Sequence, residues 1–411
     1  MQVKMKNKRF NYTNKHHGLS RIKVYTVKVL LILTAIILII PQAGCQKKKD
    51  PTPLWDEGFY LDTICRITLY ATDDELKMSV AKPILNDAFD IIRRYETILS
   101  KTKEGSDIWR INNAEGQPIA CDAATVELLN KALSYCEESN GEFDITIGGV
   151  MDLWDFHDVT GTAKVPSSAE LSRKLRHVDY KSVLIEGNTV TLLDPDAQLD
   201  LGGIAKGFIA DKVAQYLRSR GVTGAVIDLG GNIEVVGYKA GWVPLASEVQ
   251  ELGDVDGDGT EDEEGGIAGG TPFVVGVKKP YTETNEIIGT LTVANKSIVT
   301  SGVYERFFES NGKKYHHILS SKTGYPVNND LISVTVIGPV NTSADCDALA
   351  TICMLKGLEG AKELIAAHEG YGAIFIDSEG EITSVGKMPE LKLLTDEDTE
   401  SDLTEEGIKV D

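Results

Sequence analysis

One carboxylate and one hydroxyl lie four residues apart late in the chain, on Asp347 and Thr351. The surrounding pattern predicts a helix that begins near Thr342, and residues four apart on a helix point the same way. Carboxylate and hydroxyl oxygens are hard ligands of the kind that Mg²⁺ takes in proteins. An Asp early in a helix also stabilises the helix dipole, so the pair alone is consistent with a cation site or with a structural helix start.

A second candidate is the segment 199–207, which reads Leu-Asp-Leu-Gly-Gly-Ile-Ala-Lys-Gly. Leu199–Leu201 alternates like the end of a strand, and from Ile204 onward apolar residues recur at helical spacing until Gly221. The first turn of a helix has unpaired N–H groups, and Lys206 adds a positive charge, so this turn can bind an anion. Its spacing fits neither the Walker loop nor the dinucleotide fingerprint, and a purely structural turn is the alternative.

His317 is the third candidate, in a strand-like segment before a glycine-containing turn. An imidazole can take a proton near neutral pH, which makes His317 a candidate general base; a packing or hydrogen-bonding role is the alternative.

Strands and helices must alternate to position these groups. Apolar alternation predicts strands, and apolar residues at helical spacing predict helices. The expected strands are 61–70, 183–185, 189–193, 232–237, 273–277, 289–293, 333–337 and 373–377. The expected helices are 75–98, 126–139, 168–178, one following Ile204, 342–355 and 360–368, with a polar loop over 99–113. This mixture predicts an α+β fold.

The net charge of the chain limits the classes of partner that it can bind. The 411 residues carry 42 Lys and Arg against 62 Asp and Glu, a net charge of −20. Residues 1–44 hold eight of the basic residues and no acidic one, so the remainder carries −28. Such an acidic surface argues against nucleic acid as a partner, because phosphate backbones need a basic face.

The N-terminus resembles an export signal. After the basic residues comes a run of 12 residues from Val29 to Ile40 that is apolar except for Thr34, followed by Ala-Gly-Cys at 43–45. This pattern is similar to a bacterial lipoprotein signal over 1–44, with Cys45 lipidated and 45–55 a tether beside an anionic membrane. A plain signal peptide or a signal anchor is the alternative. We therefore expect an extracytoplasmic, lipid-anchored protein.

Two acidic segments and five cysteines are also notable. Residues 254–265 match part of a calcium loop, but Gly265 stands where the bidentate Glu belongs, so either calcium binding or a solvated loop fits. Residues 393–411 are acidic and are expected to be a disordered tail. The cysteines after Cys45 have no Cys-x-x-Cys spacing and predict buried free thiols.

Six motifs occur in the order that is typical of the ApbE family of FAD:protein FMN transferases, and the resemblance covers about 61–376. They are Glu-Phe-Asp-Ile-Thr-Ile-Gly (142–148) with Leu-Trp-x-Phe (153–156), segment 199–208 with Asp211, Thr-Ser-Gly (300–302) with Arg-Phe-Phe (306–308), Tyr-x-His-Ile (315–318), Thr-Gly-Tyr-Pro (323–326) and Asp-Ala-Leu-Ala-Thr (347–351). The resemblance implies an ApbE-like domain over 56–392, with an acidic insertion at 253–270. It also implies two interleaved lobes with the active site in the crevice between them.

The resemblance further implies Mg²⁺-dependent transfer of FMN from FAD to a threonine hydroxyl of a partner protein, with release of AMP. By position it assigns the metal to Asp347, Thr351 and the carbonyl of Gly203, and His317 is the candidate base. The implied FAD contacts are Leu61, Thr102, Glu142, Phe143, Asp144, Asp200, Lys206 and Ile318. Thr102 stands where many members have an aromatic residue.

Two other functions use the same site. A Mg²⁺-dependent FAD pyrophosphatase would replace the threonine hydroxyl with water, and a non-catalytic lipoprotein would only bind FAD. The resemblance places the acceptor proteins in membrane or extracytoplasmic electron transfer.

Overall fold

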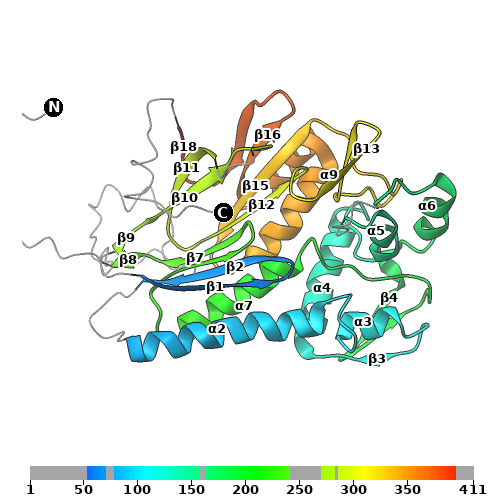
Figure 1. Ribbon diagram of the computed structural model, residues 1–411, viewed down its shortest axis with the longest axis horizontal. Helices are drawn as coiled ribbons and strands as arrows, with labels where there is room; N and C mark the ends of the chain where they lie inside the picture. The colour runs from blue at the N-terminus through cyan, green and yellow to red at the C-terminus, as the bar shows by residue number, and fades with distance from the viewer. Residues whose placement is uncertain (1–52, 71–77, 157–162, 241–269, 283–285, 395–411) are drawn as a thin grey trace, which may run out of the picture. The chain divides into compact units, whose positions relative to one another are not determined.

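Strands from both halves of the chain form one eight-stranded antiparallel sheet (Figure 1). The computed structural model describes residues 53–70, 78–156, 163–240, 270–282 and 286–394. In spatial order the strands are β1 (Leu54–Tyr60), β2 (Thr63–Leu69), β6 (Gly224–Leu229), β7 (Asn232–Gly237), β12 (Lys296–Gly302), β15 (Leu331–Pro339), β16 (Gly372–Asp377) and β17 (Ile382–Gly386). Every neighbouring pair is antiparallel.

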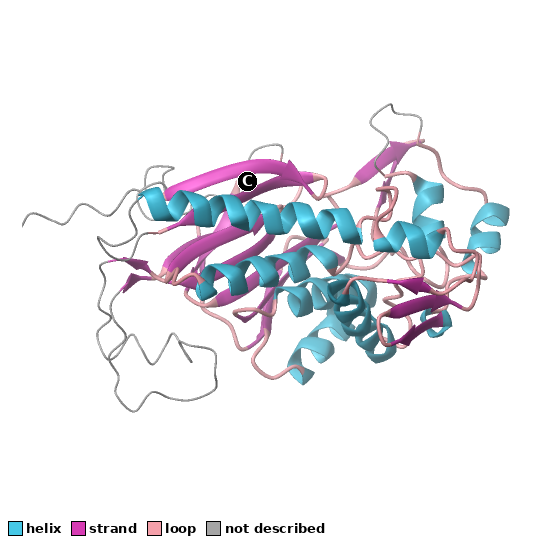
Figure 2. Cartoon of the chain, turned by 90° about the horizontal axis from the view of Figure 1, so that it is seen from below, coloured by secondary structure: helices cyan, strands magenta, loops and turns pink. Residues whose placement is uncertain are grey.

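The two faces of this sheet bury alternate residues against different partners. One face packs against α2 (Met78–Leu99), α7 (Ala205–Ser219) and α9 (Ser343–Ala367), and Figure 2 shows helices lying along the strands. The other face packs against the small sheet β10 (Phe273–Lys278), β11 (Ile287–Val293) and β18 (Leu391–Leu393). Side chains on a strand alternate between faces, so each strand contributes to both cores.

A second lobe gathers at one end of the sheet in Figure 1. Its elements are α3 (Asp107–Asn112), β3 (Ile119–Ala120), α4 (Ala123–Glu138), α5 (Gly148–Trp154), α6 (Ser168–Leu175), the 3₁₀ turn Tyr180–Ser182, β4 (Val183–Glu186) and β5 (Thr189–Leu192). The late ribbon of β13 (Phe307–Ser310) and β14 (Lys313–His316) returns to it, because Phe308 and Tyr315 pack on Trp154. The chain thus passes between two interleaved lobes, and the predicted α+β class is confirmed.

The predicted strand at Leu199–Leu201 is wrong. The Asn112 side chain accepts from the Leu199 N–H at 2.7 Å and donates to the Leu199 carbonyl at 3.0 Å, and the Asp200 N–H donates to Ile145 O at 2.7 Å. Buried backbone groups need partners, and here a distant side chain and a loop supply them instead of a strand.

The predicted loop at 99–113 contains a helix. Ser106 caps α3 by accepting from the Trp109 N–H, and Asp107 lies in the first turn, so a Ser-Asp pair starts a helix here. The strand predicted from Leu61 begins only at Thr63, since Leu61 and Asp62 form a left-handed turn with φ of 55° and 58° after β1.

The two helices predicted after Thr342 are confirmed as two helical segments of α9, which are separated by the non-helical Gly357 (φ 72°). Thr342 does not cap it through its side chain. The predicted strands 183–185 and 189–193 pair as β4 and β5 of a hairpin. Gly221, where the helix is predicted to stop, is left-handed (φ 78°).

Some predictions fall outside the described residues: the leader 1–44, the tether up to residue 52, the calcium-like loop 254–265, the insertion 253–269 and the tail from 395. Leu54 and Trp55, counted with the tether, lie in β1, and Leu393 lies in β18. Within the described ranges, each helix is too short or too polar to cross a bilayer.

Candidate functional site

The crossing of α7 and α9 holds the candidate site, and a glycine makes the crossing possible. A Cβ on Gly207 would lie 2.1 Å from the Ser343 carbonyl oxygen, so only glycine lets the two helices approach this closely. Asp211, one turn further along α7, accepts from the Ser343 N–H at 2.7 Å and the Ala344 N–H at 3.0 Å. Asp211 therefore caps the first turn of α9 in place of Thr342.

This crossing brings Asp347 and Thr351 to the double-glycine turn. The Gly207 N–H donates to Asp347 Oδ2 at 3.0 Å. A Cβ on Gly203 would lie 3.2 Å from Thr351 Oγ1 and 3.0 Å from the Phe143 ring. The carboxylate, the hydroxyl and the Gly203 backbone, which come from two distant parts of the sequence, thus share one corner, called the α7–α9 corner below.

The negative charge of Asp347 in the α7–α9 corner is only partly compensated by its neighbours. Burial raises the pKa of Asp347, and Lys206, the Gly207 N–H and the Asn232 side chain only partly offset the effect. Asp347 is 3% exposed. A buried carboxylate that stays short of positive charge is a suitable place for a cation.

Two further acids beside Lys206 were not predicted. Burial raises the pKa of Asp228 and of Glu305 to about 6 each, and Lys206 lowers both. The Glu305 side chain is exposed to solvent. Glu305 precedes the Arg-Phe-Phe motif, which is the one signal in the sequence that points to it.

His317 is held by its neighbour across the ribbon. The backbone N–H of His317 donates to the Arg306 carbonyl oxygen at 3.1 Å, and the ring nitrogen Nδ1 lies 3.3 Å from the same oxygen. A carbonyl only accepts, so Nδ1 carries the proton and Nε2 is the basic nitrogen. Burial, with the Arg306 charge, lowers the pKa of His317 to about 3, so the ring is neutral at pH 7. Ile318, next in sequence, is buried.

Comparison with known proteins decides the family. The sequence model of the ApbE family matches residues 61–375. The chain belongs to the ApbE family. Two relatives named FAD:protein FMN transferase come from Treponema pallidum (33% identity over 77% of this chain and 82% of the relative) and Klebsiella pneumoniae (32%, 77% and 86%). The solved ApbE protein of Thermotoga maritima superimposes with a TM-score of 0.67 and 26% identity over 81% of this chain and 97% of its own.

The other residues that the sequence predicts as FAD contacts form two groups. Phe143 packs on Gly203. The neighbouring Glu142 pairs with Lys356 at 3.0 Å and with Lys322 at 3.4 Å. Asp144 is buried and accepts from Thr146 and the Tyr180 N–H, so in this ApbE protein it stabilises the loop. A cavity of about 330 Å³ opens beside it, lined by residues including Asn140, Lys181 and Ser321.

The other side is formed by Asp200 and the loop after α2. Asp200 accepts from the Gly202 N–H at 2.8 Å and pairs with Lys101 at 2.9 Å. Thr102 is exposed and bonds to Ser100. Glu96 links this loop to the β1–β2 turn, because it accepts from the Leu61 N–H at 2.8 Å and pairs with Lys103.

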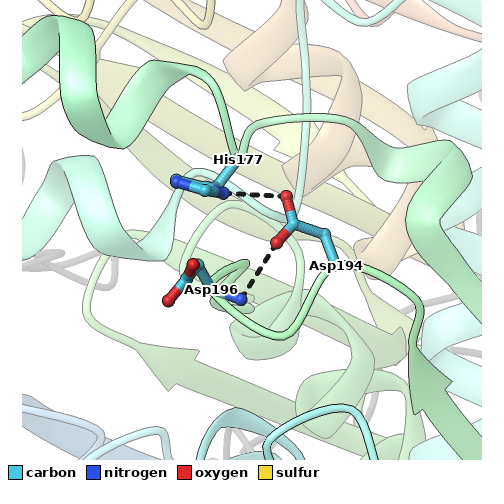
Figure 3. Close-up of side chains that lie close together, drawn as sticks. All are labelled: His177, Asp194 and Asp196. Carbon is cyan, nitrogen blue, oxygen red and sulfur yellow. Dashed lines mark hydrogen bonds and ion pairs between the residues drawn. The ribbon is translucent and has the colours of Figure 1, made fainter.

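Figure 3 shows a separate group, His177, Asp194 and Asp196, whose ligand atoms lie within 4.8 Å of one another. His177 Nδ1 lies 2.8 Å from Asp194 Oδ2, and the Asp196 N–H donates to Asp194 Oδ1 at 3.0 Å. Both Asp194 oxygens thus already have partners in the chain, and the group stabilises the turn at Asp194–Asp196.

Proposed function

We propose that this ApbE-family protein is a FAD:protein FMN transferase that attaches FMN to a threonine hydroxyl of a partner protein and releases AMP. The observation that carries the proposal is the α7–α9 corner, where Asp347 and Thr351 meet the Gly203–Gly207 turn beside Lys206. The names of the two relatives support the same activity.

The residues of the corner fit Mg²⁺. Asp347, Thr351 and the Gly203 carbonyl offer hard oxygen donors, and the buried Asp347 lacks full charge compensation. When bound, Mg²⁺ would neutralise charge on the pyrophosphate. Lys206, near the N-terminus of α7, would bind the phosphates of FAD through its positive charge, because it lies close to Asp347, the proposed metal ligand.

In the proposed reaction the acceptor Oγ forms a bond to the phosphorus on the FMN side, and the bond from that phosphorus to the AMP oxygen breaks. His317 Nε2 would take the hydroxyl proton. A pKa of about 3 makes it a weak base in the resting protein. The negative charge of bound phosphates would raise this pKa and make the transfer easier.

We also propose that Cys45 is lipidated and that the enzyme acts outside the cytoplasmic membrane on acceptors of electron transfer. The support is the leader pattern of residues 29–45. Mass spectrometry of the protein extracted from the native membrane should find a diacylglyceryl group on Cys45 and no residues before it.

The test of activity incubates the chain from residue 46 with FAD, MgCl₂ and the exported proteins of its host. A mass increase of one FMN on a threonine, with AMP released, supports transfer. Free FMN and AMP without labelled protein would support the pyrophosphatase instead, and unchanged FAD would support a binding protein. EDTA should stop the transfer, and an Asp347→Asn protein is the matched control.

A further inference from the structure

The outward face of the β1–β2 hairpin carries large apolar side chains that nothing in the described structure covers. Trp55 is 54%, Phe59 72% and Ile64 57% exposed. Phe59 pairs directly with Ile64, and Trp55 pairs with Thr68, so all three side chains lie on the same face. Isolated exposed apolar residues are ordinary, but an aligned group on one sheet face indicates an interaction surface.

This face, called the hairpin face below, continues a buried face of the main sheet. Thr68 pairs with Val226, which lies in the core under β10, β11 and β18. The small sheet covers that part and leaves the hairpin open, at the edge seen in blue in Figure 1. Between the apolar residues, Arg66 pairs with Glu57 at 2.7 Å and lies over the Trp55 ring at 5.3 Å. Aromatic rings mixed with a paired charge are typical of surfaces at the membrane–water interface.

The position of the hairpin in the chain indicates what covers it. Eight residues lie between Cys45 and Leu54, where β1 begins, and an extended chain over these nine Cα–Cα steps reaches about 30 Å. A lipid anchor at Cys45 would therefore hold the hairpin face close to a bilayer whatever the orientation of the protein. Tethering at this distance gives an effective concentration on the order of 1 mM, at which a small apolar face binds.

We propose that the hairpin face of Trp55, Phe59 and Ile64 docks on the surface of the lipid bilayer. The inference rests on the proposed anchoring of Cys45 and adds a second contact, made by the folded domain itself. The hairpin also contains the Leu61 turn, and its Thr63 packs so closely on Gly230 that a Cβ there would lie 2.2 Å from Thr63 Oγ1. Docking would thus hold this end of the sheet near membrane-bound acceptors.

The test replaces Cys45 by a hexahistidine tag and holds the chain from residue 46 on phosphatidylcholine vesicles that contain a nickel-chelating lipid. Vesicles with brominated acyl chains should quench part of the tryptophan emission that plain vesicles leave unchanged. Trp55→Phe should remove this quenching, and Phe59→Ser with Ile64→Ser should reduce it at least twofold. Leu193→Ser, at a site 62% exposed outside the hairpin, is the matched control and should have no effect.

Equal emission on plain and brominated vesicles, with the protein fully bound, would overturn the proposal. Quenching that persists in Trp55→Phe would overturn it too, and so would a dimer in sedimentation velocity that Phe59→Ser with Ile64→Ser abolishes. None of these readouts needs FAD, an acceptor or acylation. Failure of FMN transfer, or of acylation at Cys45, is therefore seen separately.

Discussion

Two buried aspartates on the two sides of the α7–α9 crossing have opposite surroundings. Asp211 is 6% exposed, and both its oxygens accept backbone N–H groups of α9. Asp347 is 3% exposed, but its neighbours are one N–H of α7, the Asn232 side chain and the Lys206 charge. Burial raises the pKa of both. Burial and a shifted pKa therefore do not distinguish the acid that caps α9 from the proposed metal ligand, whereas their hydrogen-bond partners differ.

Replacing Asp347 or Asp211 by asparagine should give the largest difference between the proposed metal ligand and the residue that caps α9. Asp347→Asn should lower the rate of FMN transfer more than about 100-fold, since even residues behind metal ligands cost 10- to 100-fold. The same change should raise the free energy of unfolding of the metal-free protein, because it removes a desolvated charge. Asp211→Asn also removes a desolvated charge, but it leaves one N–H of α9 without an acceptor, which costs about 1 kcal/mol, so it should gain less stability than Asp347→Asn. Urea unfolding and a transfer assay on both variants give the four values, and normal turnover by Asp347→Asn would contradict the metal assignment.

Substitution by alanine at Gly207 and at Gly203 should also change the free energy of unfolding by different amounts. Gly207→Ala forces a Cβ against the Ser343 backbone, at 2.1 Å, and should cost about 3 kcal/mol or more. Gly203→Ala meets only the side chains of Phe143 and Thr351, at 3.0 and 3.2 Å, and should cost less. Urea unfolding measures both, and equal losses would show that the helix crossing is not as tight as described.

Asp211, which caps α9, should contribute to the pH dependence of the free energy of unfolding. Burial raises the pKa of Asp211 from 3.8 to about 7, and it also raises the pKa of the neighbouring Glu234, which is fully buried. The folded state thus binds more protons than the unfolded state between about pH 4 and 7, so these groups make stability fall as pH rises through this range. Unfolding at pH 5, 6, 7 and 8 should show a smaller fall for Asp211→Asn. Parallel curves would mean that Asp211 does not titrate in this range.

The smallest expected effect is a change in the pKa of His317. Burial is the main cause of its lowered pKa and the Arg306 charge the second, so Arg306→Met should raise the pKa from about 3 but leave it below 6.5. Titration followed by NMR of histidine-labelled protein measures the shift. A return to the ordinary value would assign the whole effect to Arg306.

The sequence by itself determined the elements whose order is local. Alternation predicted β2, β7, β10 and β15, and helical spacing predicted α2, α4 and α7 with its left-handed end at Gly221. It also placed Asp347 and Thr351 on one helix face, because the period of a helix is a property of neighbouring residues. The family motifs then joined this pair to Gly203, and the structure brings the three together.

Only the tertiary structure decided which partners these elements meet. Asn112 keeps Leu199 out of a strand across 87 residues, and Asp211 caps α9 across 132 residues. Glu305 and Asp228 reach Lys206 from separate strands and turns, which no spacing in the sequence records. A hydrogen bond or a charge pair between distant segments leaves no period along the chain. Such contacts exist only once the sheet and the helices have packed.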